Sequence, residues 1–465
     1  MPASPIRKLV PLAEAARARG TKIYHLNIGQ PDLPSPQTGL DALKKIDRTV
    51  LEYSPSDGYR SLREKLVGYY EQFQIKLSPD DIIVTTGGSE AVLFAFMSCL
   101  NPGDEIIVPE PAYANYMAFA ISAGAVIRPV VSSIEQGFAL PDVAEFEKLI
   151  NDRTRGILIC NPNNPTGYLY TRKEMNRIRD LVKKYDLFLF SDEVYREFIY
   201  TGSPYISACH LEGIEQNVVL IDSVSKRYSE CGIRIGALIT KNRTLRNAVM
   251  KFCQARLSPP LIGQIVAEAS IDAPRSYSTE VYEEYIERRK CLIDGLNRLP
   301  GVYSPIPMGA FYTVARLPVE DSDDFSHGVS PTSTTKAKPL CSPPHRASTP
   351  IRHAAATKSA SPTYSRRKTS NGRWSYWARR SKHITTGNSP TGNLGHAVRH
   401  YLCRTFSWKP VCPAPPGVSA NPIPYRSIFR NFRPKSLGGR DSFPTFALDF
   451  YTPQQAYSIN QTNTL

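Results

Sequence analysis

The sequence has no long hydrophobic run, and this absence limits where the protein can act. No stretch of about 18 apolar residues occurs in the 465-residue chain, so we expect no membrane-spanning helix. Residues 1–8 contain no apolar core of the length that a secretory signal peptide needs. We therefore expect a cytoplasmic protein without a membrane partner.

The nine cysteines are scattered, and they form no metal-binding or redox motif. The chain contains neither a Cys-x-x-Cys pair nor the cysteine and histidine spacing of a zinc site. Scattered thiols of this kind are typical of a reducing compartment. The sequence therefore predicts no metal site.

Acidic residues are nearly absent from the last 140 residues. After Phe325 there are 20 Lys or Arg residues but only two acids, Asp441 and Asp449. The whole chain has 57 basic and 42 acidic residues and a net charge of +15, so the first 325 residues carry 37 basic and 40 acidic residues, a net charge of −3. All three tryptophans and six of the eight histidines also follow Phe325. The overall basic charge therefore says nothing about the partners of the first part.

Apolar runs alternate with helical segments in the first part, and this alternation predicts an α/β fold. Short buried strands are indicated by the runs at 81–84, 104–108, 156–160, 187–190 and 218–221. We expect helices at 6–19, from the loop at 53–63 to about residue 73, after Gly87, and at 173–185. Strands alternating with helices favour a parallel sheet, and ligands of such sheets bind at the carboxyl ends of the strands.

Several groups that could hold a ligand follow these strand ends. A glycine-rich helix start can bind an anion, an aromatic can stack on a ring, and an Asn-Pro turn can present an amide. Each group taken alone also fits a packed residue or an ordinary turn. The groups are Gly88 and Ser89, Tyr113, Asn164, Asp192 and Tyr195, and Ser223 and Lys226.

The stretch from Ser223 to Gly236 carries the most specific chemistry. Lys226 lies among small and hydroxyl residues, and Arg234 follows eight residues later. A lysine amine can form a Schiff base with a carbonyl cofactor if a buried site lowers its pKa. Ser223, Ser225 and Arg234 could hold a phosphate through charge-assisted hydrogen bonds. Taken alone, this stretch fits a solvated Lys–Arg pair in a loop equally well.

Considered together, these groups fit pyridoxal 5'-phosphate. They comprise an anion site, a stacking ring, a buried acid and a lysine. The acid would keep the pyridine nitrogen protonated, so that the ring can act as an electron sink. Five strand ends that converge on one cofactor are stronger evidence than any single motif.

Residues 1–325 resemble the pyridoxal-phosphate-dependent class I and II aminotransferases of fold type I, and most of all their aspartate aminotransferase-like group. The resemblance rests on Asn161-Pro-Asn-Asn-Pro-Thr-Gly167, Ser191-Asp-Glu-Val-Tyr195, and Ser223-x-Ser-Lys226 with Arg234. It implies an α/β fold with a mostly parallel large domain and a truncated α/β small domain. The implied division is an N-terminal arm with a small-domain segment (1–45), the cofactor-binding domain (46–290) and the start of the C-terminal small domain (291–325).

The resemblance also implies a role for each candidate residue. Lys226 would form the Schiff base and move the substrate proton, and Asp192 would pair with the pyridine nitrogen. Asn164 and Tyr195 would bond the phenolic oxygen of the ring, and Tyr113 would stack on the ring. Gly88, Ser89, Ser223 and Arg234 would hold the phosphate, Gly29 and Asn164 would lie beside the substrate, and Tyr53 would reach the phosphate of a neighbouring subunit.

The implied reaction is transamination between an amino acid and a 2-oxo acid in amino acid metabolism. Aspartate and 2-oxoglutarate are the expected substrates. The role of Tyr53 requires a homodimer. The resemblance implies no role for Glu90 or Cys231.

The family pattern stops near Phe325–Ser326. A family member should continue with an arginine that clamps the substrate α-carboxylate, but residues 326–465 are rich in Ser, Thr, Pro and Arg, a composition that does not readily build a core. Codons permitted for residues 356–370, read in another frame, give a stretch similar to the missing arginine segment. Residues 327–339 and 340–353 give two further matches in the right order. We therefore predict a shifted reading frame, a disordered tail and impaired turnover.

Two other functions stay open at this stage. A different enzyme of the same fold type, such as a β-lyase, would share the cofactor residues. Alternatively, the basic tail could bind nucleic acid, because 366–368 and 379–382 are basic and lie near Trp374 and Trp377. The shifted frame explains the composition of the tail without selection for binding, so nucleic acid is not the expected partner.

Overall fold

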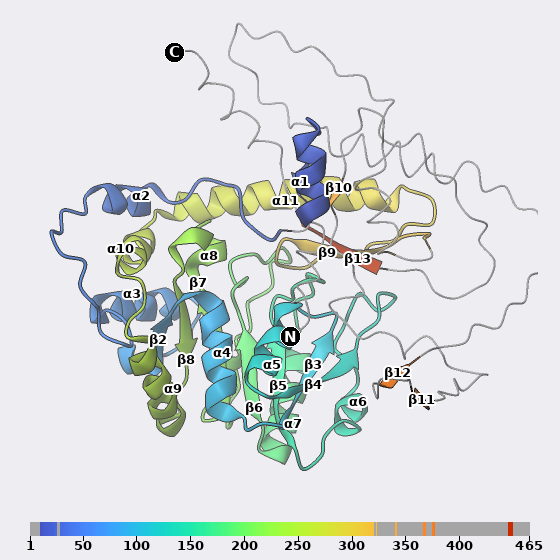
Figure 1. Cartoon of the computed structure of the whole chain (residues 1–465), viewed down its shortest axis with the longest axis horizontal. Coiled ribbons are helices and arrows are strands. Elements are labelled where there is room, and N and C mark those ends of the chain that lie inside the picture. The colour runs from blue at the N-terminus through green and yellow to red at the C-terminus, as the bar shows by residue number, and fades with distance from the viewer. Residues whose placement is uncertain are drawn as a thin grey trace, which may run out of the picture.

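A seven-stranded sheet forms the centre of the molecule, with the strand order β2-β8-β7-β6-β5-β3-β4 (Figure 1). The computed structural model describes residues 10–25, 28–319 and 322, and four short strands beyond them. All sheet strands run in one direction except β8, which is antiparallel to β2 and β7. The strands are β2 Ile82–Thr85, β3 Glu105–Glu110, β4 Val126–Val131, β5 Thr154–Cys160, β6 Phe188–Asp192, β7 Val218–Ser223 and β8 Gly236–Ile239. The predicted mostly parallel sheet is confirmed.

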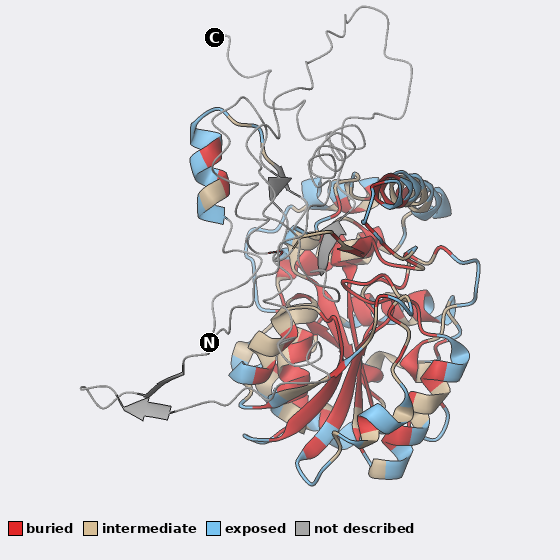
Figure 2. Cartoon of the chain, turned by 90° about the vertical axis from the view of Figure 1, so that its right-hand side faces the viewer, coloured by how far each residue is buried: buried red, intermediate tan, exposed pale blue. Residues whose placement is uncertain are grey.

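Helices cover both faces of the sheet and make it the buried core of the molecule (Figure 2). Apolar side chains of α4, α5 and α9 pack on one face, and those of α6 and α7, with α3 and α10, pack on the other. Strands buried on both faces are apolar at nearly every position, which is why they appear as continuous runs in the sequence. The helices are α1 Val10–Ala18, α2 Gln37–Lys44, α3 Arg60–Glu71, α4 Gly87–Cys99, α5 Asn115–Ser122, α6 Val143–Glu147, α7 Arg172–Tyr185, α8 Val224–Arg227, α9 Arg243–Arg256, α10 Leu261–Ser270 and α11 Arg275–Asn297.

A second apolar core lies between the long helix α11 and β9, Tyr312–Arg316. It contains Tyr285 and Leu292 of α11 together with Phe311, all buried. Helix α11 continues through residue 290, where the sequence division places a domain boundary. That division stays a prediction.

Only four short strands are described beyond Ser322. Strand β13 (Thr445–Asp449) pairs antiparallel with β9, and β10 (Leu340–Cys341) pairs parallel with β1 (Tyr24–His25). Strands β11 (Arg366–Lys368) and β12 (Trp374–Tyr376) pair with each other. The rest of the predicted tail at 326–465 lies outside the described residues, as does the start of the helix expected at 6–19.

Within the described ranges, the helices include none that is long and apolar enough to cross a bilayer. The same residues contain no group of three or more His, Cys, Asp or Glu side chains arranged to hold a metal ion.

Candidate active site

A pocket of about 540 Å³ opens at the carboxyl ends of β5, β6 and β7. The sequence predicts a ligand at these same strand ends. The pocket is lined by ten of the predicted site residues: Gly29, Gly88, Ser89, Tyr113, Asn164, Asp192, Tyr195, Ser223, Lys226 and Arg234.

One end of the pocket is built to hold an anion. Helix α4 begins there at Gly87, so its first backbone N–H groups and the positive end of its dipole face the pocket. The Arg234 guanidinium lies against the same turn, with Nη2 3.4 Å from the Thr86 carbonyl. A Cβ atom at Gly87 would lie 2.3 Å from Arg234 Nη2, so only glycine admits the arginine there. The Ser223 hydroxyl adds a polar group to the lining.

Lys226 lies on α8, a single helical turn at the carboxyl end of β7 (Figure 1). Ser223 caps this turn, because its hydroxyl accepts a hydrogen bond from the Ser225 amide at 3.2 Å. The Lys226 amine donates to the Gly29 carbonyl at 2.5 Å and lies 3.9 Å from Cys231 Sγ. The lysine therefore points into the pocket.

Gly29 occupies a position where no side chain fits. A Cβ atom there would lie 1.9 Å from the Tyr312 hydroxyl. The nearness of the Tyr312 hydroxyl therefore explains a glycine at this position. The place of Gly29 beside the substrate stays a prediction.

Asp192 ends β6 and is buried at the side of the pocket. Its Oδ2 accepts a hydrogen bond from the Tyr116 hydroxyl at 2.5 Å. Burial raises the pKa of Asp192 to about 6, and the bond from Tyr116 acts in the opposite direction. A buried carboxylate in this state favours a cationic partner, since a nearby positive charge restores the ionised form.

A row of hydroxyl and amide groups also lines the pocket. Asn164 Nδ2 donates to the Tyr195 hydroxyl at 3.2 Å, and the Tyr195 and Tyr312 hydroxyls lie 2.7 Å apart. Burial raises the pKa of Tyr195 well above its usual range, so this phenol stays protonated. It can therefore donate a hydrogen bond to a ligand oxygen.

The sequence analysis missed two residues of this site, Tyr116 and Tyr312. Tyr116 packs edge-on against Tyr113 at 5.3 Å between ring centroids, and its hydroxyl holds Asp192. In the sequence Tyr116 looks like any core aromatic on an apolar helix. Tyr312 follows Gly309-Ala-Phe, and that glycine was the only local sign of a close approach.

Tyr53 is the one predicted site residue that does not line the pocket. Its side chain is 75% exposed, and the neighbouring Val50 and Leu51 are 67% and 60% exposed. The role predicted for Tyr53 needs a second copy of the chain and stays a prediction.

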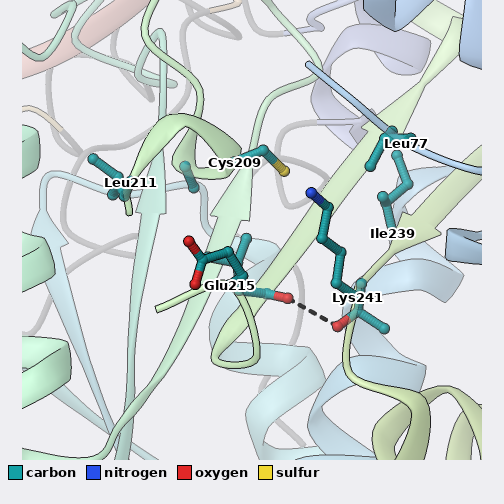
Figure 3. A pocket seen from close by; sticks show the side chains of 9 residues that line it. Leu77, Cys209, Leu211, Glu215, Ile239 and Lys241 are labelled. Carbon is teal, nitrogen blue, oxygen red and sulfur yellow. Dashed lines mark hydrogen bonds between the residues drawn. The ribbon is translucent and has the colours of Figure 1, made fainter. Parts of the chain in front are cut away.

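A second pocket lies at the opposite ends of the strands, beside the first residue of β7 and the last residue of β8 (Figure 3). Lys241, Glu215 and Cys209 point toward it, and the Thr240 hydroxyl bonds the Val218 carbonyl at 3.0 Å. Its space of about 10 Å³ would hold one water molecule at most. It cannot accept an organic ligand.

The larger pocket fits pyridoxal phosphate. The anion end matches the phosphate, Asp192 matches the ring nitrogen, and the Asn164–Tyr195 pair matches the phenolic oxygen. Lys226 lines the same pocket and supplies the amine that could bond the cofactor aldehyde.

The sequence profile of the family "Aminotransferase class I and II" matches residues 21–337. The chain belongs to this family. The predicted membership is thereby confirmed, and membership implies dependence on pyridoxal phosphate and a transferase activity.

Characterised aminotransferases are similar to most of this chain. The aspartate aminotransferase of Pyrococcus horikoshii is 33% identical over 306 residues, which cover 63% of this chain and 76% of the relative. The enzyme of the same name from Thermotoga maritima is 31% identical over 326 residues, 68% of this chain and 84% of the relative.

Solved aminotransferase structures confirm the predicted fold. The crystal structure of the Thermotoga maritima aspartate aminotransferase superposes with a TM-score of 0.69 at 28% identity, over 75% of this chain and 90% of that one. The structure of an alanine aminotransferase from Pyrococcus furiosus superposes with a TM-score of 0.66 at 31% identity, over 70% of this chain and 85% of that one.

Proposed function

We propose that this aminotransferase binds pyridoxal phosphate through Lys226 and transfers an amino group between an amino acid and a 2-oxo acid. The observation that carries the proposal is the meeting of three groups in one pocket: the Lys226 amine, the anion site at Arg234 and the buried Asp192. The relatives named aspartate aminotransferase support aspartate and 2-oxoglutarate as the substrates.

Some residues of the pocket would take part in the chemistry of the reaction. When bound, the cofactor supplies an electron sink for the charge left at the substrate Cα. Asp192 holds the proton on the ring nitrogen, and Tyr116 orients the Asp192 carboxylate. Lys226 carries the proton from the substrate, and the Gly29 carbonyl holds its amine in place before reaction.

The other pocket residues bind and orient. The phosphate would be held by the amino end of α4 together with Ser89, Ser223 and Arg234. Asn164 and Tyr195, which are hydrogen-bonded to each other, would donate to the ring's phenolic oxygen and so stabilise its negative charge. Tyr113 forms one wall for the ring, and Gly29 leaves room for the substrate carboxylate.

The activity of this chain is proposed to be impaired. The family's α-carboxylate arginine is expected after Phe325, and the printed sequence there does not follow the family. Losing a buried bidentate contact costs about 2–5 kcal/mol of binding. Restoring the reading frame should raise kcat/KM by about thirty-fold or more, at 1.4 kcal/mol for each factor of ten.

The direct test is to add pyridoxal phosphate to the purified 465-residue protein. We expect a new absorbance band and, after borohydride reduction, a covalent mass increase on the peptide that contains Lys226. Lys226→Ala should abolish the mass increase while keeping the fold. No increase in the unaltered protein would refute the proposal.

A substrate screen separates transamination from the β-lyase alternative. Transamination releases a 2-oxo acid and requires a second 2-oxo acid as acceptor, whereas a β-lyase releases ammonia and needs no acceptor. Release of ammonia together with a 2-oxo acid when no acceptor is added, from the frame-restored chain, would favour the lyase.

The basic tail provides the remaining alternative. Salt-dependent binding of the full chain to DNA, lost when residues 326–465 are removed, would support a nucleic-acid partner. We propose instead that the tail has no binding role, and that the protein acts as a cytoplasmic homodimer.

A further inference from the structure

Four buried charged residues adjoin the pocket without lining it. Glu193, Arg196, Asp222 and Arg227 are all at most 6% exposed. Three of them are sequence neighbours of pocket residues: Glu193 follows Asp192, Asp222 precedes Ser223, and Arg227 follows Lys226. Asp222 and Ser223 are neighbours on β7, and side chains alternate between faces along a strand, so Asp222 points away from the side of Ser223. We call the four residues the buried ionic cluster.

Asp222 is the centre of the cluster. Its Oδ2 accepts hydrogen bonds from Arg227 Nη2 at 2.5 Å, from the Tyr70 hydroxyl at 2.5 Å and from Arg196 Nη1 at 3.2 Å. Its Oδ1 accepts the Ser223 amide at 2.7 Å. The two arginines hold the pKa of Asp222 below its usual range despite its burial. Asp222 is therefore a buried carboxylate that accepts four hydrogen bonds.

The bond from Asp222 to Arg227 spans the turn that carries Lys226. Helix α8 has only four residues, too few to be stable by its own backbone hydrogen bonds. Asp222 lies just before the Ser223 cap, and Arg227 is the last residue of the turn. The ion pair therefore joins the two ends of the turn.

Arg196 extends the connection to β6. Its Nη2 donates to Glu193 Oε2 at 3.0 Å, while Nη1 reaches Asp222 on β7. Glu193 is fixed in turn by the Ser207 hydroxyl at 3.0 Å and the Ala208 amide at 2.9 Å. The cluster thus links the end of β6, which carries Asp192, to the end of β7, which leads to Lys226.

Aromatic rings of α3 enclose the two arginines. The Arg227 guanidinium carbon lies 4.0 Å from the Tyr69 ring centroid, and that of Arg196 lies 5.0 Å from the Tyr70 centroid. Among the residues that the structure describes, Arg196 Nε and Arg227 Nη1 have no hydrogen-bond partner. Burying four charges with incomplete pairing is costly compared with an apolar core, so stability alone gives a poor account of the cluster.

We propose that the buried ionic cluster positions Lys226 relative to Asp192 for reaction with the cofactor aldehyde. The inference rests on the proposed function. In that reaction Lys226 Nζ adds to the aldehyde carbon, a carbon–nitrogen double bond replaces the carbon–oxygen one, and the oxygen leaves as water with both amine protons. The cluster residues touch neither reactant, so they are positioning residues.

The test compares covalent capture with simple binding in the full chain. Arg227→Met removes the charge, keeps an unbranched side chain and leaves Asp222 bonded to Arg196, Tyr70 and the Ser223 amide. We expect the rate of pyridoxal phosphate capture by the cofactor-free protein to fall at least about tenfold. The affinity for pyridoxamine phosphate, which has no aldehyde, should not change. Arg227→Lys, which keeps the charge, should recover part of the rate.

Arg63→Met is the matched control. The Arg63 side chain is 8% exposed and pairs with Asp57 at 3.3 Å, but it lies outside the pocket and its adjoining turns. We expect it to lower the unfolding temperature without slowing capture. If Arg227→Met does not fold, Tyr70→Phe removes one hydrogen bond from Asp222 and should slow capture by a smaller factor.

The outcomes separate the two proposals. If the unaltered chain captures no pyridoxal phosphate, the proposed function fails and this inference with it. If it does capture the cofactor and Arg227→Met matches its rate, only the positioning role is wrong. Equal slowing by Arg63→Met would show that capture follows overall stability and would also overturn the positioning role.

Discussion

Asp192 is a residue whose surroundings disfavour its own charge. Burial raises its pKa from 3.8 to about 6, and its hydrogen bond from Tyr116 offsets only part of that change. In a folded protein without a cationic ligand this carboxyl group is therefore a source of instability near neutral pH. A protonated ring nitrogen would convert it into a favourable pair.

The pH dependence of unfolding should reveal how much the buried Asp192 carboxylate destabilises the cofactor-free protein. The Asp192 carboxyl group has a pKa of 3.8 in the unfolded chain and about 6 in the native protein, so between these pH values the native protein binds more protons. The free energy of unfolding therefore falls as the pH rises from 3.8 to about 6. Asp192→Asn should remove about 2–3 kcal/mol of that fall in the cofactor-free protein. Urea unfolding at pH 4 and pH 7 checks the prediction. Burial also raises the pKa values of Glu230 and Glu110, to about 7 and about 8. These two groups act equally in the unaltered protein and in Asp192→Asn, so the test is the difference between the two proteins in how the free energy of unfolding changes with pH. Identical slopes would contradict the prediction.

Gly29 can be tested in a similar way. Gly29→Ala would place a methyl group 1.9 Å from the Tyr312 hydroxyl and displace the carbonyl that accepts from Lys226. We expect kcat/KM of the frame-restored enzyme to fall about a hundredfold, as a displacement of about 1 Å at a reacting group can cause.

Gly68 supplies the control for that substitution. It lies within α3, and a Cβ atom there would meet no atom of the described residues within 4 Å. Gly68→Ala should raise the free energy of unfolding by about 0.5–1 kcal/mol and leave kcat/KM unchanged. Equal kinetic effects at the two positions would show that Gly29 has no special role.

At the scale of the element, α7 shows how a helix is specified locally. Thr171 and Glu174 form a reciprocal cap, with the Thr171 amide bonding Glu174 Oε2 at 2.7 Å and the Glu174 amide bonding Thr171 Oγ1 at 3.3 Å. Lys183 and Lys184 lie in the last turn, where they complement the helix dipole. These signals explain why the sequence placed this helix at 173–185, one residue from its observed start.

Removing the cap should therefore weaken the protein measurably. Thr171→Ala should lower the free energy of unfolding by about 0.5–2 kcal/mol, and Thr171→Ser should restore most of it. Chemical denaturation measures both. Because the cap lies far along the chain from Lys226, cofactor capture should be unaffected, and a change in capture would show that α7 influences the site.

Elements without such local signals were not predicted. Strand β8 has four residues, and it is a strand because β2 and β7 hydrogen-bond to its two edges. Helix α8 depends on the Ser223 cap and on the Asp222–Arg227 pair, contacts that no periodicity reveals. The cofactor residues were found because their types and spacings are restricted by chemistry, whereas Tyr116 and Tyr312 resemble ordinary core aromatics.

At the scale of the whole molecule, the single chain leaves an apolar segment uncovered. Val50, Leu51 and Tyr53 are all at least 60% exposed. A patch of this kind favours an interface, and the family resemblance assigns Tyr53 to the phosphate of a second subunit.

We therefore predict a dimer in solution. Sedimentation should give twice the mass of one chain, and Tyr53→Phe should weaken pyridoxal phosphate binding by about three- to tenfold, as expected for the loss of one hydrogen bond of about 1 kcal/mol. Val50→Asp should shift the protein toward monomers and weaken binding as well. A monomeric protein that binds the cofactor tightly would contradict both expectations.

The reversed direction of β8 has a consequence for the order in which the site can assemble. Because β8 returns beside β7, the chain goes from Ser223 through Lys226 to Arg234 without a crossover over the sheet. Contacts between near neighbours in sequence close with little loss of chain entropy, whereas Asp192 and Asn164 must be brought from more distant segments. We therefore expect the segment that carries Lys226 and Arg234 to form locally, before the parallel strands bring Asp192 and Asn164 to it.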